Sequence, residues 1–230
     1  MATRSSPINL KPETVNTPIV IAIDGPSASG KSTNSRLIAK GLGYAYVDTG
    51  AMFRAFAWFC LKRSVNVHDS TAVAAELRDW NATLECVDGQ VRLLVDGYFP
   101  EKEIRTAETS AAVSPIAAVL EVRMWMKEAQ RSCVKFGNLV MEGRDIGTHI
   151  FPETPLKFYL DASAEERSRR REAEGVKDDL AARDQRDSTR ATAPLKIAAD
   201  AIVINNAGET PQQTSERMLT EIRRLMAERK

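Results

Sequence analysis

The sequence predicts an α/β fold, built on a doubly wound parallel sheet of five strands. Short apolar runs rich in Val and Ile alternate with helical patterns, as expected where crossover helices connect buried parallel strands. The first run ends abruptly in a glycine-containing loop, and a helical pattern follows at once. The predicted strands are residues 19–24, 44–47, 138–142, 156–161 and 201–205.

Helical patterns fill much of the chain between these strands. A helix is expected to begin near Lys31 and to end at about residues 41–43, where two glycines occur. Residues 51–62 are apolar and helical in pattern, and residues 115–134 predict one long helix. The spacing of apolar residues in the last segment predicts an amphipathic closing helix, which buries Met218, Leu219, Ile222, Leu225 and Met226.

Residues 66–112 interrupt this alternation and are predicted to form a small insertion. Residues 69–80 can form a helix with Asp69 as its N-cap. Residues 83–87 and 90–95 flank Asp88-Gly89, a signal for a two-residue hairpin turn. A second Asp-Gly pair at residues 96–97 could lead into a third short strand. The sequence therefore predicts an antiparallel β unit inserted into the parallel α/β chain.

Composition and charge limit the functions that are compatible with this fold. The chain has 230 residues, 43% of them hydrophobic, and a formal net charge of +1. This length suits one domain, and the charge argues against general binding of a nucleic-acid polymer. The three cysteines, Cys60, Cys86 and Cys133, are widely spaced and are expected to be reduced thiols in a cytoplasmic protein.

The ends of the chain give no signal for membrane targeting. Residues 1–17 are polar and lack an apolar core, so they are expected to form a flexible lead-in before a domain at 18–230. No apolar run approaches the roughly 18–20 residues that a membrane-spanning helix needs. A monomer that binds no membrane is the default expectation.

The strongest motif covers residues 25–32, GPSASGKS, which matches the phosphate-binding loop GxxxxGK[ST] in full. It lies directly after a predicted buried strand and directly before a predicted helix. Successive backbone N–H groups can surround a phosphate at the positive end of the helix dipole. Lys31 would reach the β- and γ-phosphates, and the Ser32 hydroxyl would ligate Mg²⁺. A P-loop enzyme that uses Mg·ATP is therefore predicted.

The phosphate acceptor must be identified from other parts of the chain. The guanine-reading motif of small GTPases is absent, and the size of the chain does not suggest a motor ATPase. Phosphoryl transfer requires two anions to be brought in line and neutralised, so arginines near the carboxyl edge of the sheet are candidates. Three clusters qualify, at residues 48–54 (DTGAMFR), 142–148 (EGRDIGT) and 183–190 (RDQRDSTR). The third, taken alone, is more typical of an exposed, salt-bridged helix face.

The order and spacing of these motifs resemble the bacterial-type cytidylate kinase family. The resemblance extends from about residue 19 to the C-terminus. Besides the P-loop and the three clusters, it includes EIRT at 103–106, a VS…VR pattern at 113–123, LDASAEER at 160–167 and APLxxAxDAI at 193–202. It implies transfer of a phosphoryl group from ATP to CMP or dCMP, with the insertion on the acceptor side and a short, Arg-rich lid at about 167–190.

The resemblance also implies roles for individual residues. Cytosine would be read by Ser114, Arg123 and Asp145, and the ribose would be held by Arg183 and Asp187. The acceptor phosphate would contact Thr49, Arg54, Arg144 and Arg190, and the catalytic charges would be Lys31, Arg144 and Arg190. ATP would contact Gly25, Pro26, Ser27, Ala28, Ser29, Gly30, Lys31, Ser32 and Thr33 of the loop, and Arg167 and Arg171 of the lid.

This chain departs from the family pattern at three places. Phe53 stands where a Tyr is usual, only eleven residues separate Arg171 from Arg183, and Asn205-Asn206 replaces an Asp-containing pair. Two alternatives therefore remain open from the sequence. One is a P-loop kinase for another acceptor, such as a different nucleoside monophosphate, shikimate or dephospho-coenzyme A. The other is a nucleotide-binding module without catalysis.

Overall fold

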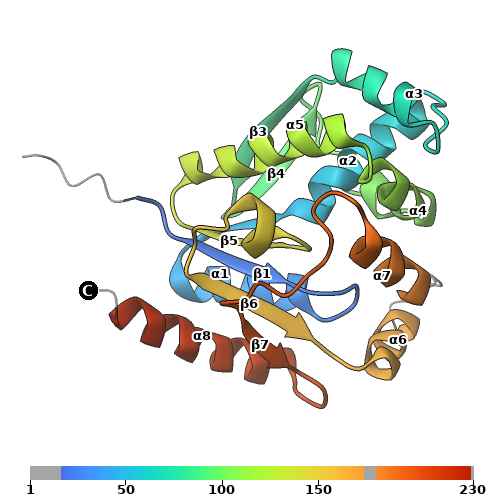
Figure 1. Cartoon of the computed structure of the whole chain (residues 1–230). Helices are drawn as coiled ribbons and strands as arrows, with labels where there is room; N and C mark the ends of the chain where they lie inside the picture. The colour runs from blue at the N-terminus through green and yellow to red at the C-terminus, as the bar shows by residue number, and fades with distance from the viewer. Residues whose placement is uncertain (1–16, 174–179, 229–230) are drawn as a thin grey trace, which may run out of the picture.

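A computed structural model describes residues 17–173 and 180–228, whose strands form one seven-stranded sheet (Figure 1). The strands are β1 (Val20–Asp24), β2 (Ala45–Asp48), β3 (Ala82–Val87), β4 (Gln90–Val95), β5 (Leu139–Gly143), β6 (Leu156–Asp161) and β7 (Ile202–Asn205), in the spatial order β3-β4-β2-β5-β1-β6-β7. The predicted α/β class and the five predicted parallel strands are confirmed, as β2-β5-β1-β6-β7.

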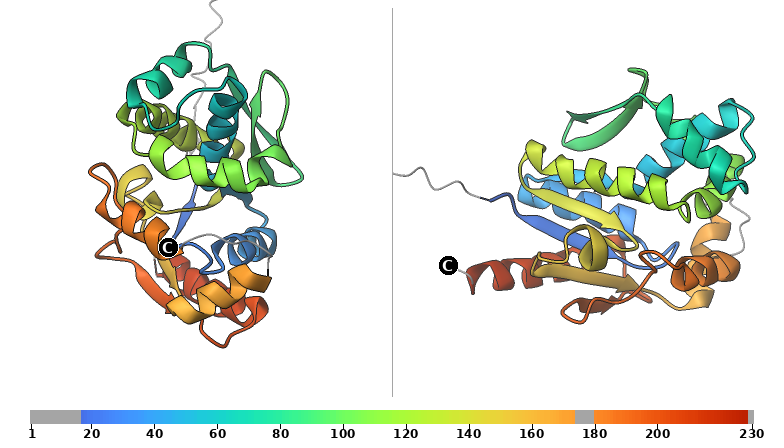
Figure 2. Two further views of the ribbon diagram at one scale, coloured as in Figure 1. Left: turned by 90° about the vertical axis from the view of Figure 1, so that its right-hand side faces the viewer. Right: turned by 45° about the horizontal axis from the view of Figure 1, so that its top comes forward.

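The helices cover both faces of this sheet. They are α1 (Lys31–Leu42), α2 (Thr49–Lys62), α3 (Ser70–Ala75), α4 (Ala107–Ile116), α5 (Leu120–Arg131), α6 (Ala164–Ala173), α7 (Leu180–Thr189) and α8 (Pro211–Ala227). One core cluster packs α2, α4 and α5 on one face, and a second packs α1 and α8 on the other. Figure 2 shows these two helical layers from two further sides.

The hairpin of the insertion extends the sheet instead of standing apart from it. Asp88 and Gly89 have φ values of 51° and 73°, as the predicted type I′ turn requires. β3 pairs antiparallel with β4, but β4 pairs parallel with β2 through Tyr46 and Val47. The second Asp-Gly turn leads to a single bridge between Val95 and Tyr98 and not to a further strand.

The helix predicted at residues 115–134 is two helices. Thr106 begins α4 by accepting the backbone N–H of Thr109, so Pro115 lies in the last turn of α4 and does not start a helix. The chain turns through residues 117–119, and α5 begins at Leu120. Arg123 in α5 donates to the Ala117 carbonyl across this break at 3.3 Å. The break therefore places the first turn of α5 beside the end of α4.

Capping side chains fix two further helix starts, of which the sequence predicts the one at Asp69. Asp69 accepts the N–H groups of Thr71 and Ala72 at the start of α3. Thr210 and Gln213 form a reciprocal capping box at the start of α8.

Parallel strands end at one edge of the sheet, so the loops that follow them meet there. α6 and α7 lie across this edge at the right of Figure 1, while β1 begins and α8 ends at the opposite side. Residues 1–16, which include almost all of the predicted lead-in, lie outside the described residues, as do residues 174–179 of the predicted lid.

Candidate active site

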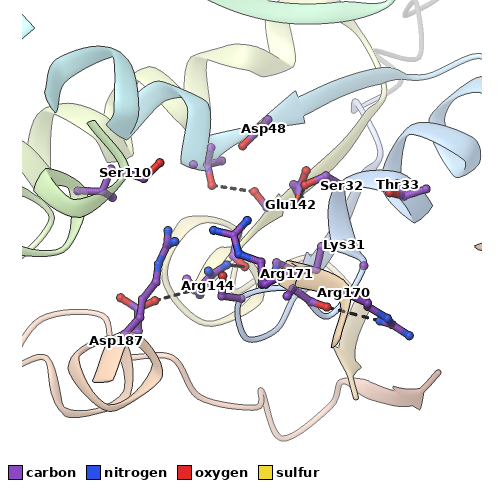
Figure 3. A pocket seen from close by; sticks show the side chains of 18 of the residues that line it. Lys31, Ser32, Thr33, Asp48, Ser110, Glu142, Arg144, Arg170, Arg171 and Asp187 are labelled. Atoms are coloured by element: carbon purple, nitrogen blue, oxygen red, sulfur yellow. Dashed lines mark hydrogen bonds and ion pairs between the residues drawn. The ribbon is translucent and has the colours of Figure 1, made fainter. Parts of the chain in front are cut away.

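A single cavity of about 1210 Å³ opens at the carboxyl edge of the sheet. Figure 3 shows side chains of α1, β5, α6 and α7 pointing into it. Sixteen of the predicted site residues line it, namely Ser27, Ala28, Gly30, Lys31, Ser32, Thr33, Thr49, Arg54, Ser114, Arg123, Arg144, Asp145, Arg171, Arg183, Asp187 and Arg190. Residues that span more than 160 positions of the sequence, from Ser27 to Arg190, are therefore brought together.

The loop before α1 has a backbone that only small residues can form. Gly25 has a φ of 152°, and a Cβ there would lie 2.2 Å from the Leu160 carbonyl oxygen. Gly30, with a φ of 88°, is the residue before the helix. Its position requires the left-handed conformation that glycine adopts without strain. Gly25, Pro26 and Ser29 support this loop without lining the cavity.

Lys31 is held inside the loop and is almost fully buried. Its Nζ donates to the Pro26 carbonyl at 2.5 Å and to Ser29 Oγ at 3.4 Å. Burial, together with the positive charge of Arg144, lowers the pKa of Lys31 to about 7, although the charges of Glu142 and Asp24 act in the opposite direction. An anionic ligand beside Lys31 would therefore raise its pKa again and favour the charged amine.

A buried carboxylate, Glu142, lies beside the loop at the end of β5. It accepts hydrogen bonds from the hydroxyl of Ser32 at 3.0 Å and from the hydroxyl of Tyr46. Burial raises the pKa of Glu142, and the nearby Asp48 raises it further. Burial also opposes ionisation of Asp48, but its ion pair with Arg54 at 2.9 Å holds the pKa of Asp48 below the ordinary value.

A buried ion pair lines a second part of the cavity. Arg123 Nη2 lies 2.5 Å from Asp145 Oδ2, and both side chains are less than one-tenth exposed. The ring of Phe53 packs against this pair, with its centroid 5.7 Å from the Arg123 guanidinium carbon. Ser114, in α4, lines the same cavity. The pair presents donors and an acceptor in a site screened from water, which suits recognition of a planar polar base.

Between these two parts lies a cluster of arginines around Asp187. Arg144 Nε donates to Asp187 at 3.0 Å, a contact drawn in Figure 3, and Arg190 lies 3.7 Å from the other carboxylate oxygen. Burial lowers the pKa of Arg190, and so does the positive charge of Arg123. One carboxylate thus compensates two guanidinium groups, and the cluster can accept further negative charge.

Of the two arginines of α6 that were predicted for ATP, Arg171 lines the cavity and Arg167 does not. Arg167 lies outside the cavity lining, where it donates to the Ser27 carbonyl at 3.2 Å and pairs with Asp184. Arg170 lines the cavity and donates to Asn206 Oδ1 at 3.3 Å, and Asn206 in turn donates to the Ser29 carbonyl at 3.0 Å. One face of α6 therefore braces the phosphate loop.

Glu142, Arg36, Arg105 and Asn206 also line the cavity, although sequence reasoning gave them no role. Glu142 had a usable signal, because it is a carboxylate at the end of the strand that pairs with β1. Asn206 follows the last parallel strand in the same way. Arg36 and Arg105 gave no pattern of their own.

Two classes of site are not found in the part of the chain that the structure describes. Within residues 17–173 and 180–228, no three His, Cys, Asp or Glu side chains gather into a metal-binding group. In the same ranges, no helix has the length and apolar character needed to cross a bilayer.

A phosphate loop at the carboxyl edge of a parallel sheet, facing an arginine cluster, defines a P-loop phosphotransferase. The cytidylate kinase family model matches residues 21–224. The chain belongs to the cytidylate kinase family.

Curated relatives agree with this membership over most of their length. The chain is 38% identical to the cytidylate kinase of Caldicellulosiruptor bescii, with 87% of this chain and 94% of the relative covered. It is 42% identical to that of Desulfitobacterium hafniense, with 87% and 90% covered. A solved structure of a putative kinase from Chloroflexus aurantiacus is 16% identical, with a TM-score of 0.43 and coverage of 92% and 97%.

Proposed function

We propose that this chain transfers the γ-phosphoryl group of ATP to CMP or dCMP, giving ADP and CDP or dCDP. One observation carries the proposal: a single cavity joins the phosphate loop with Lys31 to the buried Arg123–Asp145 pair. The first part suits a triphosphate donor, and the second suits a polar base. The arginine cluster around Asp187 lies between the two, where the reacting phosphates would meet.

The donor would lie along the loop with its phosphates at the N-terminus of α1. Backbone N–H groups and Lys31 would hold the β- and γ-phosphates. Arg170 and Arg171 line the cavity from α6 and would cover the donor from the lid side. Arg167 would act through the loop, because its contacts are with Ser27 and Asp184.

The oxygen groups near Ser32 fit a magnesium ion that is shared with phosphates. Hydroxyl and carboxylate oxygens are the ligands that Mg²⁺ prefers, and one or two protein groups are usual when phosphates supply the others. Ser32 would contribute its hydroxyl, and Glu142 would orient that hydroxyl through the 3.0 Å bond between them. When bound, Mg²⁺ neutralises charge that develops on the transferring phosphates.

Thr49, Arg54, Arg144 and Arg190 would hold the acceptor phosphate. The Thr49 hydroxyl donates to the Glu142 carbonyl at 2.7 Å, which places its oxygen at the end of β5. A phosphate oxygen of CMP is the attacking atom, and its bond to the γ-phosphorus forms as the bond to the β,γ-bridging oxygen of ATP breaks. A nucleotide phosphate is already ionised near neutral pH, so the step needs positioning and charge compensation more than a general base.

Cytosine would be distinguished from uracil by the buried pair. A carboxylate such as Asp145 accepts from the N4 amino group, and a guanidinium such as Arg123 donates to N3 and O2. Uracil has the opposite pattern at positions 3 and 4, so it would leave buried groups unpaired. Ser114 would add a hydroxyl to the base site, and Arg183 and Asp187 would hold the sugar.

The proposal places the reaction in the cytoplasm and in one subunit. Cys60, Cys86 and Cys133 are free thiols, as is usual in a reducing compartment. The phosphate loop, the arginine cluster and the Arg123–Asp145 pair all line one cavity of this chain, which supports a monomer as the working unit.

The test is ADP production with Mg·ATP and each of CMP, dCMP, UMP, AMP, GMP and shikimate, with Lys31→Ala as the blank. Turnover confined to CMP and dCMP is expected. Rapid turnover with another acceptor would refute the base assignment and keep the kinase class. Binding of both nucleotides without turnover would identify a nucleotide-binding module instead.

A further inference from the structure

Asp24, the last residue of β1, has no role in the proposed chemistry, yet its side chain is almost fully buried. Its Oδ1 accepts the backbone N–H of Ile146, and its Oδ2 accepts the backbone N–H of Gly147, each at 2.8 Å. These partners are 122 and 123 residues away in the chain. Such a carboxylate, with two short buried hydrogen bonds, fixes the position of the segment that it holds.

That segment follows directly after Asp145. The residues Ile146–Ile150 form a single turn of π-helix, and the backbone carbonyl of Asp145 accepts the N–H groups of His149 and Ile150. In the other direction, Asp24 continues into Gly25 and the phosphate loop. One side chain therefore connects the start of the donor-binding loop to the turn that carries the proposed base-reading carboxylate.

The contact is close because the turn has a glycine at its second position. A Cβ on Gly147 would lie 3.4 Å from Asp24 Oδ2 and 3.1 Å from the side chain of Lys157. The turn therefore lies directly against the end of β1, and its placement depends on the two hydrogen bonds that the Asp24 carboxylate accepts.

Building on the proposed function, we propose that Asp24 is a positioning residue for the acceptor base. It holds Asp145 against Arg123 at the distance that the cytosine edge requires, and so contributes to the affinity for CMP. Both hydrogen bonds of the Asp24 carboxylate go to the turn, whereas Lys31 of the phosphate loop acts on it through its charge. Loss of Asp24 therefore weakens the binding of CMP much more than the binding of ADP.

The ionisation of Asp24 gives this role a pH signature. Burial raises the pKa of Asp24, and although the two backbone N–H groups act in the opposite direction, the resulting pKa is about 6. The charged and titratable groups that face it are Asp145 from the turn, Lys31 from the phosphate loop and Tyr159 from β6. When Asp24 is protonated, one of its two oxygens becomes a hydroxyl that points a hydrogen at a backbone N–H. One of the two hydrogen bonds from Ile146 and Gly147 is therefore lost below about pH 6.

The variant Asp24→Asn reproduces this protonated form at every pH. Its amide oxygen can accept one N–H, while its NH₂ group faces the other donor. The matched control is Asp161→Asn at the end of the neighbouring strand β6, where the carboxylate accepts the N–H of the next residue, Ala162, at 2.9 Å. At about pH 8, we expect Asp24→Asn to bind CMP roughly tenfold more weakly than the wild type. ADP affinity is expected within about threefold in both variants.

The comparison is then repeated from about pH 8 to about pH 5 by calorimetry. The phosphate of CMP titrates near pH 6 as well, but it does so equally for both proteins, so the ratio of their dissociation constants removes it. That ratio is expected to fall from about ten to about one, with a midpoint near pH 6, because the wild type becomes protonated at Asp24. A ratio that stays constant with pH, or equal losses of CMP and ADP affinity, would overturn the proposal.

A measurement on the wild type covers the case in which the variant does not fold. The amide resonances of Ile146 and Gly147 are followed by NMR over the same pH range. A shared transition near pH 6 is expected, and resonances that do not move would overturn the proposal. A wild type that binds no CMP would refute the proposed function, whereas CMP binding that is equal in wild type and Asp24→Asn would refute this inference alone.

Discussion

Replacing Asp145 by Ala separates recognition of the acceptor from binding of the donor. The carboxylate is 2.5 Å from Arg123, and its side chain is 8% exposed. A hydrogen bond to a charged group contributes about 1.5–3 kcal/mol, so losing the contact with N4 should lower kcat/KM for CMP about 10- to 150-fold. Lys31 and the phosphate loop do not contact Asp145, so the dissociation constant for ATP should change by less than about threefold.

The same substitution should also destabilise the protein. Removing one partner of a buried ion pair typically costs about 3–5 kcal/mol, because the other charge is left uncompensated. Arg123 keeps its bond to the Ala117 carbonyl at 3.3 Å, so the loss should lie at the lower end of that range. The double variant Arg123→Met/Asp145→Leu removes both charges and should recover most of the stability without recovering CMP turnover.

A coupled assay of ADP production at varied CMP measures the first effect, calorimetry measures ATP binding, and urea unfolding measures stability. The reasoning would be refuted if folded Asp145→Ala kept its kcat/KM for CMP, or if it lost ATP affinity to the same degree. Recovery of CMP turnover in the stable double variant would show that the pair supports the fold and does not read the base.

Three further predictions concern single groups in the cavity. Because the pKa of Lys31 is about 7, its amine is mostly neutral at about pH 8 and becomes charged when phosphates surround it. ATP binding should therefore be accompanied by uptake of a proton at about pH 8 and not at about pH 5.5. Calorimetry in buffers of different ionisation enthalpy measures the uptake, and none at about pH 8 would contradict the shift. Phe53→Tyr adds a hydroxyl to a residue that lines the cavity, and should lower KM for CMP about fivefold with KM for ATP unchanged. Glu142→Gln should weaken ADP binding about tenfold with Mg²⁺ present, because the Ser32 hydroxyl loses the carboxylate that orients it. The same substitution should leave ADP binding unchanged in EDTA. Equal effects under both conditions would contradict the role of Glu142 in orienting Ser32.

Local patterns were sufficient to predict much of this fold. The strand–loop–helix sequence at residues 19–42 carries its own signals, namely β-branched residues, glycines with special φ values and a helix stop. The five parallel strands follow from short buried apolar runs. In contrast, the pairing of β4 with β2 depends on a contact between segments more than 40 residues apart, and nothing in the hairpin sequence specifies it.

The candidate site was predictable where residue type and position agree. Arg144 and Asp145 follow a strand end between two glycines, Asp187 lies in a charged cluster, and all three line the cavity. The sequence did not show which of Arg167 and Arg170 points into the cavity. The direction of each side chain depends on how this short arginine-rich helix packs against the phosphate loop. The sequence did not indicate that Asp24 connects β1 to the turn after Asp145, because its partners are backbone N–H groups, which leave no sequence signature.

The central claim is that one cavity holds a donor at the phosphate loop and a cytosine nucleotide at the Arg123–Asp145 pair. The most direct measurement is calorimetric binding of a bisubstrate analogue in which adenosine and cytidine are joined by five phosphates. One analogue should bind per chain, compete with both ATP and CMP, and bind at least about tenfold more tightly than its uridine counterpart. Competition with ATP alone, or equal affinity for the uridine compound, would contradict the account.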